Sequence, residues 1–309
     1  MSTGNRRAYY RIVVTDGTGN CPTAPRSQSR QAPFPPPPGR ASRSELRACS
    51  RQAFAPSTTQ SGIAPEGTIV TLIYGHRGAK GEAPENTLVS FQRCLEHGVR
   101  RCELDLHLSR DGELMVIHDP TLKRTTGRRG KVSEQDAAEL ANIDARLGGP
   151  GWIQPCPIPR LAELFEKCNF EHWQLEVKSA SRVRAARTVT AIHDLVERYE
   201  LLDRVTVTSS SREVLRALRR LTPRLSRGLV AEYAWLDPVK VASNHGCELL
   251  ALNWTLCTPE RLKKARQTGL QVSVWTVNEP ALMRRLADFG VDSLITDFPG
   301  LAIATLGKG

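Results

Sequence analysis

Short apolar, β-branched runs alternate with amphipathic stretches from Thr68 to the end of the chain. Each run is four to seven residues long and is bounded by turn-forming residues, which is typical of buried strands. We therefore predict nine strands, at residues 69–74, 102–108, 114–118, 174–178, 205–209, 228–232, 249–253, 272–276 and 293–296.

Helical periodicity appears between most of these runs. Leu88, Phe91 and Leu95 mark one face of a helix over 87–97, and Gly98 is suited to end it. Strand–helix units repeated over roughly 240 residues match the size of a (β/α)8 barrel of the TIM type, an α/β fold. A doubly wound open sheet is the alternative architecture. Further helices are predicted at 182–200, 212–221, 259–268 and 280–289.

The ninth strand has a local explanation, because a short turn joins the second and third predicted strands. Asp111-Gly112 is a common two-residue hairpin turn. The third strand is therefore predicted to fold back as an antiparallel flap on the second. A turn of two residues would place Asp105 directly opposite His118, with both side chains on one face.

Two carboxylates lie on that same strand face. Glu103 precedes Asp105 by two residues, so the pleat directs both side chains to one side. Carboxylates this close raise each other's pKa unless a cation neutralises them. Oxygen ligands without sulfur favour Mg²⁺ or Ca²⁺ over Zn²⁺. A solvated polar strand face is the usual explanation of a Glu-x-Asp pattern alone, and the register with His118 favours a site.

Two other strand ends carry ionisable pairs. His76-Arg77 lies between glycines after the first strand, where the backbone can approach a ligand closely. An ordinary loop histidine is the alternative explanation. Glu176 and Lys178 share one face of the fourth strand. Because a barrel has no edge strands, this pair is expected inside the barrel or at its mouth rather than in open solvent.

The composition changes near residue 66. Residues 1–66 contain nine of the 20 prolines and nine arginines against three acidic side chains. Such a segment buries too little apolar surface to offset the entropy lost on ordering. We therefore predict a disordered extension over 1–66 and a barrel domain over 67–309.

The bulk properties restrict compartment and partners. The eight cysteines form no CxxC pair, and no run reaches the ~18 apolar residues of a membrane span. A secretory signal segment is also not recognised. These patterns predict a cytoplasmic protein with reduced thiols and no stable membrane insertion. The net charge of +11 is partly concentrated in residues 1–66, so we expect no nucleic-acid partner; the oligomeric state stays open.

Nine short motifs follow one another over about residues 70–300. They are His76-Arg77-Gly78, Pro84-Glu85-Asn86-Thr87, Glu103-Leu104-Asp105, Asp111-Gly112, His118-Asp119-Pro120, Arg124-Thr125-Thr126, Leu175-Glu176-Val177-Lys178, Val274-Trp275-Thr276-Val277-Asn278 and Thr296-Asp297-Phe298-Pro299. Together they resemble the signature of the glycerophosphodiester phosphodiesterase family.

The resemblance implies a TIM-type barrel that hydrolyses small glycerophosphodiesters to sn-glycerol 3-phosphate and an alcohol with Mg²⁺ or Ca²⁺. By position in the motifs, it implies the following roles: His76 and His118 as general acid and base, Glu103, Asp105 and Glu176 as metal ligands, Arg77 and Lys178 as phosphate contacts, Trp275 as a pocket wall, and Glu85 acting through contacts near the metal.

Two other functions stay open at this point. A related enzyme would act on lipids that retain an acyl chain, which requires an apolar rim; Trp254, Trp275 and Phe298 allow one. A binding module would use the Arg-rich segment over 1–66 to engage nucleic acid or an anionic membrane, and it leaves the carboxylates unexplained.

Overall fold

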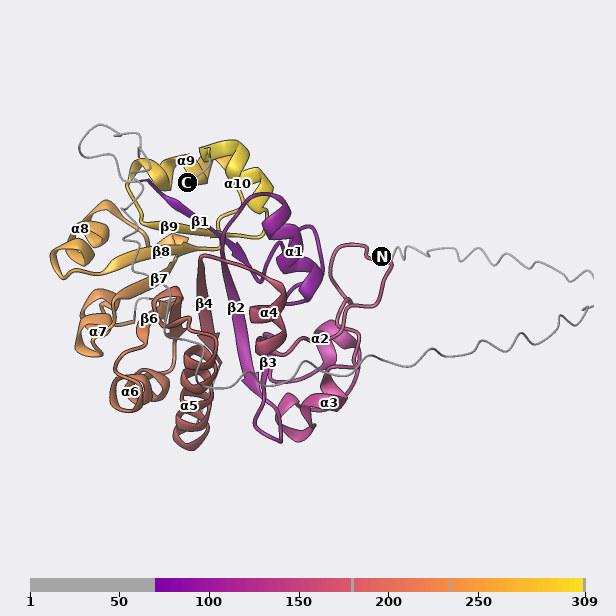
Figure 1. Ribbon diagram of the computed structural model, residues 1–309. Coiled ribbons are helices and arrows are strands. Elements are labelled where there is room, and N and C mark those ends of the chain that lie inside the picture. Colours follow the sequence, from indigo (N-terminus) through magenta and orange to yellow (C-terminus); the bar gives the residue numbers. More distant parts are fainter. Residues whose placement is uncertain (1–69, 179–180, 234, 308–309) are drawn as a thin grey trace, which may run out of the picture. The chain divides into compact units, whose positions relative to one another are not determined.

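The computed structural model describes residues 70–178, 181–233 and 235–307. The predicted extension over 1–66 lies outside these residues. Eight parallel strands form a closed barrel (Figure 1). Since β1 pairs with both β2 and β9, the barrel of eight strands has no free edge, and the doubly wound alternative is wrong. In barrel order the strands are β1 (Leu72–His76), β2 (Arg101–Leu108), β4 (His172–Val177), β5 (Val205–Ser209), β6 (Ser226–Ala231), β7 (Leu249–Asn253), β8 (Gln271–Trp275) and β9 (Ser293–Thr296).

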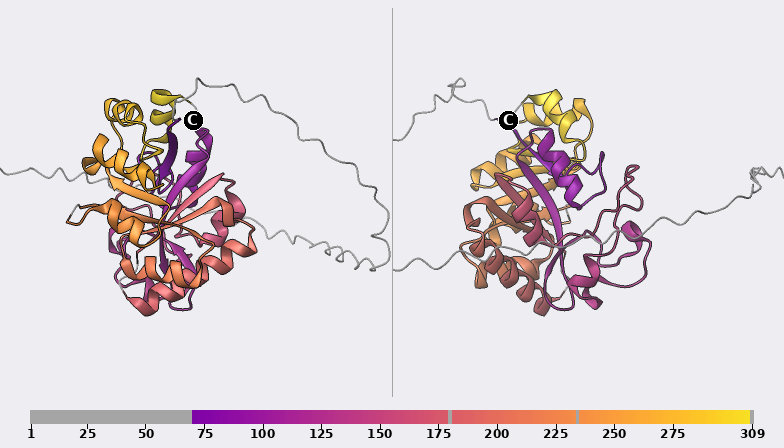
Figure 2. Two further views of the ribbon diagram at one scale, coloured as in Figure 1. Left: turned by 90° about the vertical axis from the view of Figure 1, so that its left-hand side faces the viewer. Right: turned by 45° about the vertical axis from the view of Figure 1, so that its right-hand side comes forward.

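Helices surround the barrel (Figures 1 and 2). The five predicted helices lie within two residues of their observed ends, as α1 (Leu88–Glu96), α5 (Arg182–Arg198), α6 (Arg212–Leu221), α8 (Pro259–Gln267) and α9 (Pro280–Asp288). Besides two single-turn helices described below, three helices were not predicted: α4 (Leu161–Lys167), α7 (Pro238–Asn244) and α10 (Pro299–Leu306). All three are eight residues or shorter, so their periodicity spans barely two turns.

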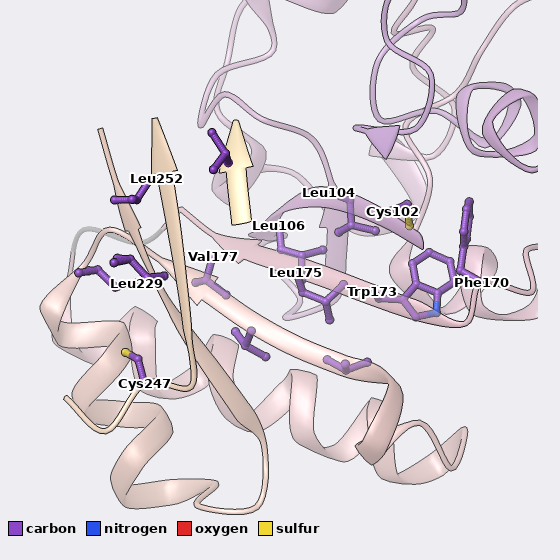
Figure 3. Packing of buried hydrophobic residues seen from close by; sticks show 14 of the residues in the cluster. Cys102, Leu104, Leu106, Phe170, Trp173, Leu175, Val177, Leu229, Cys247 and Leu252 are labelled. Atoms are coloured by element: carbon purple, nitrogen blue, oxygen red, sulfur yellow. The ribbon is translucent and has the colours of Figure 1, made fainter. Parts of the chain in front are cut away.

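Strand alternation separates the core from the site. On β4, Trp173, Leu175 and Val177 point outward into the layer between strands and helices, where they pack with Leu104 and Leu106 of β2 (Figure 3). The intervening residues of both strands must therefore face the barrel interior. Because the apolar side chains of β2 and β4 are buried against the helices, the polar side chains between them point into the barrel.

The flap after β2 has a different register from the predicted one. β3 (Leu114–Val116) is antiparallel to β2, and Leu108 pairs with Leu114. The loop therefore has three residues between Ser109 and Glu113, not two, and Gly112 has a φ of +93°. The Ser109 hydroxyl accepts from the Glu113 N–H at 2.9 Å and closes this longer loop.

The predicted pairing of Asp105 with His118 is consequently wrong by one residue. Ile117 lies opposite Asp105, because its N–H donates to the Asp105 carbonyl at 3.0 Å. β3 ends at Val116, so His118 follows the strand instead of belonging to it. His118 nevertheless reaches the mouth of the barrel, by the route described below.

A small subdomain between β3 and α4 flanks the mouth (Figure 2). It contains α2 (Lys123–Thr126), the 3₁₀ turn η1 (Val132–Glu134) and α3 (Ala137–Leu140). Its own apolar cluster includes Met115, Ile117, Leu122, Leu140 and Ile158. This second core holds the chain after β3 in a fixed position beside the barrel. Two further 3₁₀ turns, η2 (Leu202–Arg204) and η3 (Trp254–Leu256), complete the fold.

The described cysteines are free thiols, at positions 94, 102, 156, 168, 247 and 257. This agrees with the predicted absence of a disulfide framework for the part of the chain that the structure describes. Within the same residues, no helix combines the length and apolar character needed to cross a bilayer.

Candidate active site

Three carboxylates meet where β1, β2 and β4 end. Strand register brings them together: His76 pairs with Glu103 across β1 and β2, and Asp105 pairs with Glu176 across β2 and β4. Glu103 and Asp105 are buried, and the side chain of Glu176 is 13% exposed. One oxygen from each of the three lies within 4.8 Å of the others. Among the described residues, this is the one cluster of metal-ligating side chains.

The geometry of this trio fits a hard cation. Oxygens that share an Mg²⁺ or Ca²⁺ ion at 2.0–2.6 Å lie at most about 4–5 Å apart, the spacing found here. Asp105 Oδ1 is buried and accepts no hydrogen bond, although Lys178 Nζ lies 3.3 Å from it. Three acids this close to one another are further stabilised by a cation placed between them. The donor set therefore matches the predicted oxygen ligation, without any thiolate.

Burial and mutual repulsion affect the three acids differently. Burial raises the pKa of Glu103, and repulsion from Asp105 and Glu176 adds to the rise. Burial also raises the pKa of Glu176, against the opposing charge of Lys178. For Asp105 the neighbouring charges of Arg77 and Lys178 outweigh burial, so its pKa is lowered. Of the three carboxylates, Glu103 is therefore the one whose negative charge is least compensated by neighbouring cations.

Two basic side chains accompany the carboxylates. Lys178 Nζ lies 2.7 Å from Glu176 Oε1 and 3.3 Å from Asp105 Oδ1. Arg77 Nε lies 3.0 Å from Asp105 Oδ2, and its backbone N–H donates to Glu103 at 3.3 Å. Arg77 adopts a φ of +52°, a left-handed conformation that is uncommon outside glycine. Such a backbone is typically retained at functional turns.

His76 is oriented by a carboxylate. Its Nδ1–H donates to Asp297 Oδ1 at 2.6 Å, and its Nε2 lies 3.9 Å from Glu103. Asn278 donates to the other oxygen of Asp297 at 2.8 Å. Burial lowers the pKa of His76, while the hydrogen bond to Asp297 opposes this effect. Although burial acts against it, the His76 contact lowers the pKa of Asp297 to about 2.

His118 has a matching arrangement. Its Nδ1–H donates to Asp119 Oδ1 at 2.7 Å, and Arg124 of α2 holds Asp119 from the other side at 2.9 Å. The His118 carbonyl accepts from His107 Nε2 at 2.9 Å, which fixes the backbone after β3. The subdomain therefore positions this ring. In both histidines Nδ1 is engaged by a carboxylate, so Nε2 is the nitrogen left for a ligand.

Glu85 and Asn86 support the cluster from the β1–α1 loop. Glu85 accepts from Arg77 at 2.9 Å and from Arg124 at 2.7 Å, so it contacts the cations and lies outside the carboxylate trio. Asn86 donates to Asp105 Oδ2 at 2.9 Å. These contacts hold Arg77 against Asp105.

The residues expected from sequence surround one cavity of about 280 Å³. Asp105 and Glu85 are not among its lining residues: Asp105 is fully buried, and Glu85 accepts a hydrogen bond from Arg77. Trp275 forms a wall, with its indole N–H donating to the Ala251 carbonyl at 3.1 Å. The lining comprises His76, Arg77, Glu103, His118, Gln174, Glu176, Lys178, Thr208, Ser210, Val230, Glu232, Ala251, Trp275 and Ile295.

A larger cavity of about 640 Å³ lies at the opposite end of the strands, among residues such as Leu72, His172 and Gln271. It contains no metal-ligating trio from the described residues. The chemistry therefore belongs to the carboxyl ends of the strands, where barrel enzymes have their active sites.

Sequence reasoning assigned no role to four residues of this site: Asn86, Asp119, Asn278 and Asp297. Each lies in a motif that was recognised, next to a residue that received a role or at a strand end. The available signals were the polar residues that follow His118 and Glu85 and those that follow β8 and β9. Only the fold shows that Asn278 and Asp297 reach His76.

Comparison with known proteins agrees with this geometry. The model of the glycerophosphoryl diester phosphodiesterase family matches residues 76–301. A glycerophosphodiester phosphodiesterase of Caldanaerobacter subterraneus is 31% identical over 241 residues, which cover 77% of this chain and 99% of the relative.

Solved structures give the same result. A protein of Silicibacter pomeroyi, provisionally named a glycerophosphoryl diester phosphodiesterase, superposes with a TM-score of 0.72 at 29% identity, over 77% of this chain and 93% of that chain. A phosphodiesterase of Oleispira antarctica, solved with its product sn-glycerol 3-phosphate, gives 0.69 at 26% identity over 76% and 96%. The expected class of enzyme, a phosphoric diester hydrolase, is confirmed by these matches. The chain belongs to the glycerophosphoryl diester phosphodiesterase family.

Proposed function

We propose that this protein hydrolyses glycerophosphodiesters to sn-glycerol 3-phosphate and an alcohol in a reaction that requires a divalent cation. The observation that carries the proposal is the convergence of three carboxylates and two carboxylate-bound histidines on one cavity. The product bound to the Oleispira antarctica relative supports a small glycerophosphodiester as the substrate.

Glu103, Asp105 and Glu176 would hold the cation, Mg²⁺ or Ca²⁺. When bound, it supplies positive charge that polarises the phosphoryl oxygens. Hydrogen-bond support of Asp105 by Asn86 keeps one ligand in place. Arg77 is held by Glu85 and Asp105, so its guanidinium is a fixed donor for a second phosphate oxygen.

His76 and His118 would exchange protons with the diester through Nε2. One accepts a proton from the nucleophile and the other gives one to the leaving alkoxide, each transfer contributing about 10²–10⁴ in rate. Burial lowers the pKa of both rings, so the general base is neutral at pH 7, and the general acid must take up a proton at Nε2 before it can donate one. Asp297 and Asp119 engage Nδ1–H, so proton exchange takes place at Nε2, and they stabilise the imidazolium form of each ring.

Lys178 would stabilise the charge that develops on the phosphoryl group, since its side chain lines the cavity beside Glu176. Trp275 would pack against the non-reacting part of the substrate. The free cysteines of the described chain support a reducing compartment such as the cytoplasm.

Phosphorus NMR tests reaction, product and metal requirement together. Glycerophosphocholine incubated with the enzyme should give the resonance of sn-glycerol 3-phosphate, and a chelator should abolish it until Mg²⁺ or Ca²⁺ is added back. Unchanged turnover after exhaustive chelation would remove the metal from the proposal, and an inert substrate would remove the reaction.

A second candidate, hydrolysis of a diester that retains an acyl chain, is favoured by one observation. A neighbouring cavity of about 400 Å³ contains Leu229, Val241 and other apolar residues, and it shares Ser210, Val230 and Glu232 with the catalytic cavity. Turnover of lysophosphatidylcholine against glycerophosphocholine separates the two candidates.

A further inference from the structure

An apolar loop projects from the catalytic end of the barrel. It joins β6 to α7 and presents Tyr233, Trp235 and Leu236, which are 65%, 88% and 56% exposed. A tryptophan this exposed makes almost no contact with its own protein. Single exposed apolar residues are common, whereas three large ones on one short loop indicate a binding surface.

The loop adjoins the candidate active site. All three side chains line the cavity that shares Ser210 and Glu232 with the catalytic one. Anything that covers this loop therefore lies next to the mouth through which substrate enters.

Three arginines flank the loop on the same rim. Arg182 and Arg184 are in the first turn of α5, and Arg212 begins α6. These helices follow β4 and β5, and the loop follows β6, so the three features occupy consecutive sectors at the carboxyl ends of the strands (Figure 1). Arg212 also lines the cavity beside Trp235.

The positions of these arginines are unfavourable within the protein itself. A cation at a helix N-terminus opposes the helix dipole, at a cost of about 0.3–1 kcal/mol in an exposed setting. None of the three forms an ion pair with a carboxylate in the described part of the chain. Their charge is therefore available to an external anion.

The acidic residues nearby do not cancel this charge. Asp237 pairs with Lys264 and accepts from the first turn of α7, and Glu213 pairs with Arg216. Glu232 accepts from the Tyr233 hydroxyl at 3.0 Å and keeps its charge in the cavity that Arg212 also lines, so it offsets part of the charge of the three arginines. The rim thus combines exposed aromatic and aliphatic side chains with unpaired guanidinium groups.

We propose that this rim docks the enzyme on an anionic lipid surface. Tyr233, Trp235 and Leu236 enter the interfacial layer, where amphipathic aromatic rings are favoured. Arg182, Arg184 and Arg212 meet the headgroup phosphates. A single acyl chain in the neighbouring cavity would cover only the part of Trp235 that lines it, whereas a bilayer covers the whole exposed ring together with the arginines.

Co-sedimentation of the full chain with vesicles tests this docking without any turnover, so it stands independently of the hydrolysis proposed above. The protein should bind phosphatidylcholine vesicles that contain phosphatidylglycerol, bind pure phosphatidylcholine vesicles more weakly, and lose affinity at high salt. Each of Arg182→Gln, Arg184→Gln and Arg212→Gln should weaken binding about fivefold. Trp235→Ala should weaken it at least as much, and Trp235→Phe should restore most of it.

The last turns of α5 and α6 supply matched controls. Arg198 lies at the end of α5 opposite Arg182, and Leu221 lies at the end of α6 opposite Arg212 and is 42% exposed. Arg198→Gln and Leu221→Ala should bind vesicles as the wild type does. Equal binding by wild type and Trp235→Ala, including binding carried entirely by residues 1–66, would overturn the proposal. The proposal would also be overturned if Trp235→Ala changed the hydrolysis of a monomeric acylated diester but left vesicle binding unchanged.

Discussion

At the residue scale, the two histidines have similar partners but different access to water. His76 is buried beside Glu103, whereas the side chain of His118 is 32% exposed at the rim. His118 can therefore exchange its proton with solvent more readily between turnovers. The carboxylate that binds His118 Nδ1 is Asp119, which lies outside the carboxylate trio.

This separation allows the proton-transfer role to be tested apart from metal binding. His118→Ala should lower kcat about 10²–10⁴-fold, because one proton transfer is lost. Its metal affinity should stay within a few-fold of the wild type by isothermal titration calorimetry. Glu103→Ala should instead weaken metal binding strongly. Near-normal turnover by His118→Ala would exclude the ring from proton transfer.

Several site residues were predictable from sequence alone because strand periodicity is local. Glu103 and Asp105 differ by two residues, so their common face required only that β2 be a strand. Asp297 and Asn278 were not predictable in their contact with His76, which spans 221 residues for Asp297. Contacts of this kind depend on barrel closure, which no local pattern encodes.

At the element scale, the error in the hairpin shows how side chains override a turn preference. Asp-Gly favours a two-residue turn, but the hydroxyl of Ser109 both donates to Asp111 and accepts from Glu113, which stabilises a loop one residue longer. His118 still reaches the site because the chain leaves β3 before it and the subdomain directs it there. His118 is close enough to Asp105 for its charge to lower the pKa of that carboxyl, as the predicted proximity requires. The predicted strand register is wrong.

Glycine at the β1–α1 turn is required for a different reason from glycine in the hairpin. Gly78 has a φ of +82°, and a Cβ there would lie 2.5 Å from the Ser90 backbone. Gly112 has a φ of +93° with open space around it. Gly78→Ala should destabilise the protein by about 2–4 kcal/mol, and Gly112→Ala by about 1 kcal/mol. Urea unfolding checks both, and equal costs would show that steric contact at Gly78 is unimportant.

The amino-terminal end of β4 predicts a pH dependence of stability. His172 lies between Tyr74 and Thr206, with ring contacts at 3.0 and 3.2 Å. Burial lowers its pKa from 6.5 to about 4. The unfolded state therefore binds the proton more readily between these values, so stability contributed above pH 6.5 is lost as pH falls toward 4. We expect a loss of about 3 kcal/mol from this ring.

His172→Gln isolates this contribution, because a glutamine keeps hydrogen-bonding capacity without a titrating group. The drop in the free energy of unfolding between pH 7.5 and pH 4.5 should be smaller in the variant than in the wild type. Identical pH profiles by urea unfolding would mean that His172 is not the titrating group.

At the scale of the whole molecule, the boundary predicted near residue 66 can be tested by truncation. The described barrel begins at Val70, and β1 closes it by pairing with β2 and β9. A chain of residues 67–309 should therefore retain the wild-type Tm within about 2 °C and a similar kcat/KM. A large loss of either would show that residues before the boundary take part in the folded enzyme.

The carboxylate trio links stability to function across the whole domain. Burial and repulsion raise the pKa of Glu103, so its charged form disfavours the folded state at neutral pH. An ion that binds only the folded protein should reverse this, adding about 2.7 kcal/mol at a hundred times its Kd. For a domain of this size that corresponds to a rise in Tm of roughly 5–10 °C. Differential scanning calorimetry with Mg²⁺ or Ca²⁺ measures the rise.

Glu103→Gln should change both the stability without metal and the rise in Tm that metal produces. Without metal the variant should be at least as stable as the wild type, since it removes a buried charge that repels Asp105 and Glu176. With metal, its Tm should rise little, because one of the three ligands is gone. A variant less stable than the wild type in chelator would mean that Glu103 supports the fold through its charge. A metal site should show carboxylate repulsion that only a bound cation relieves. A structural ion pair should not show this dependence on metal.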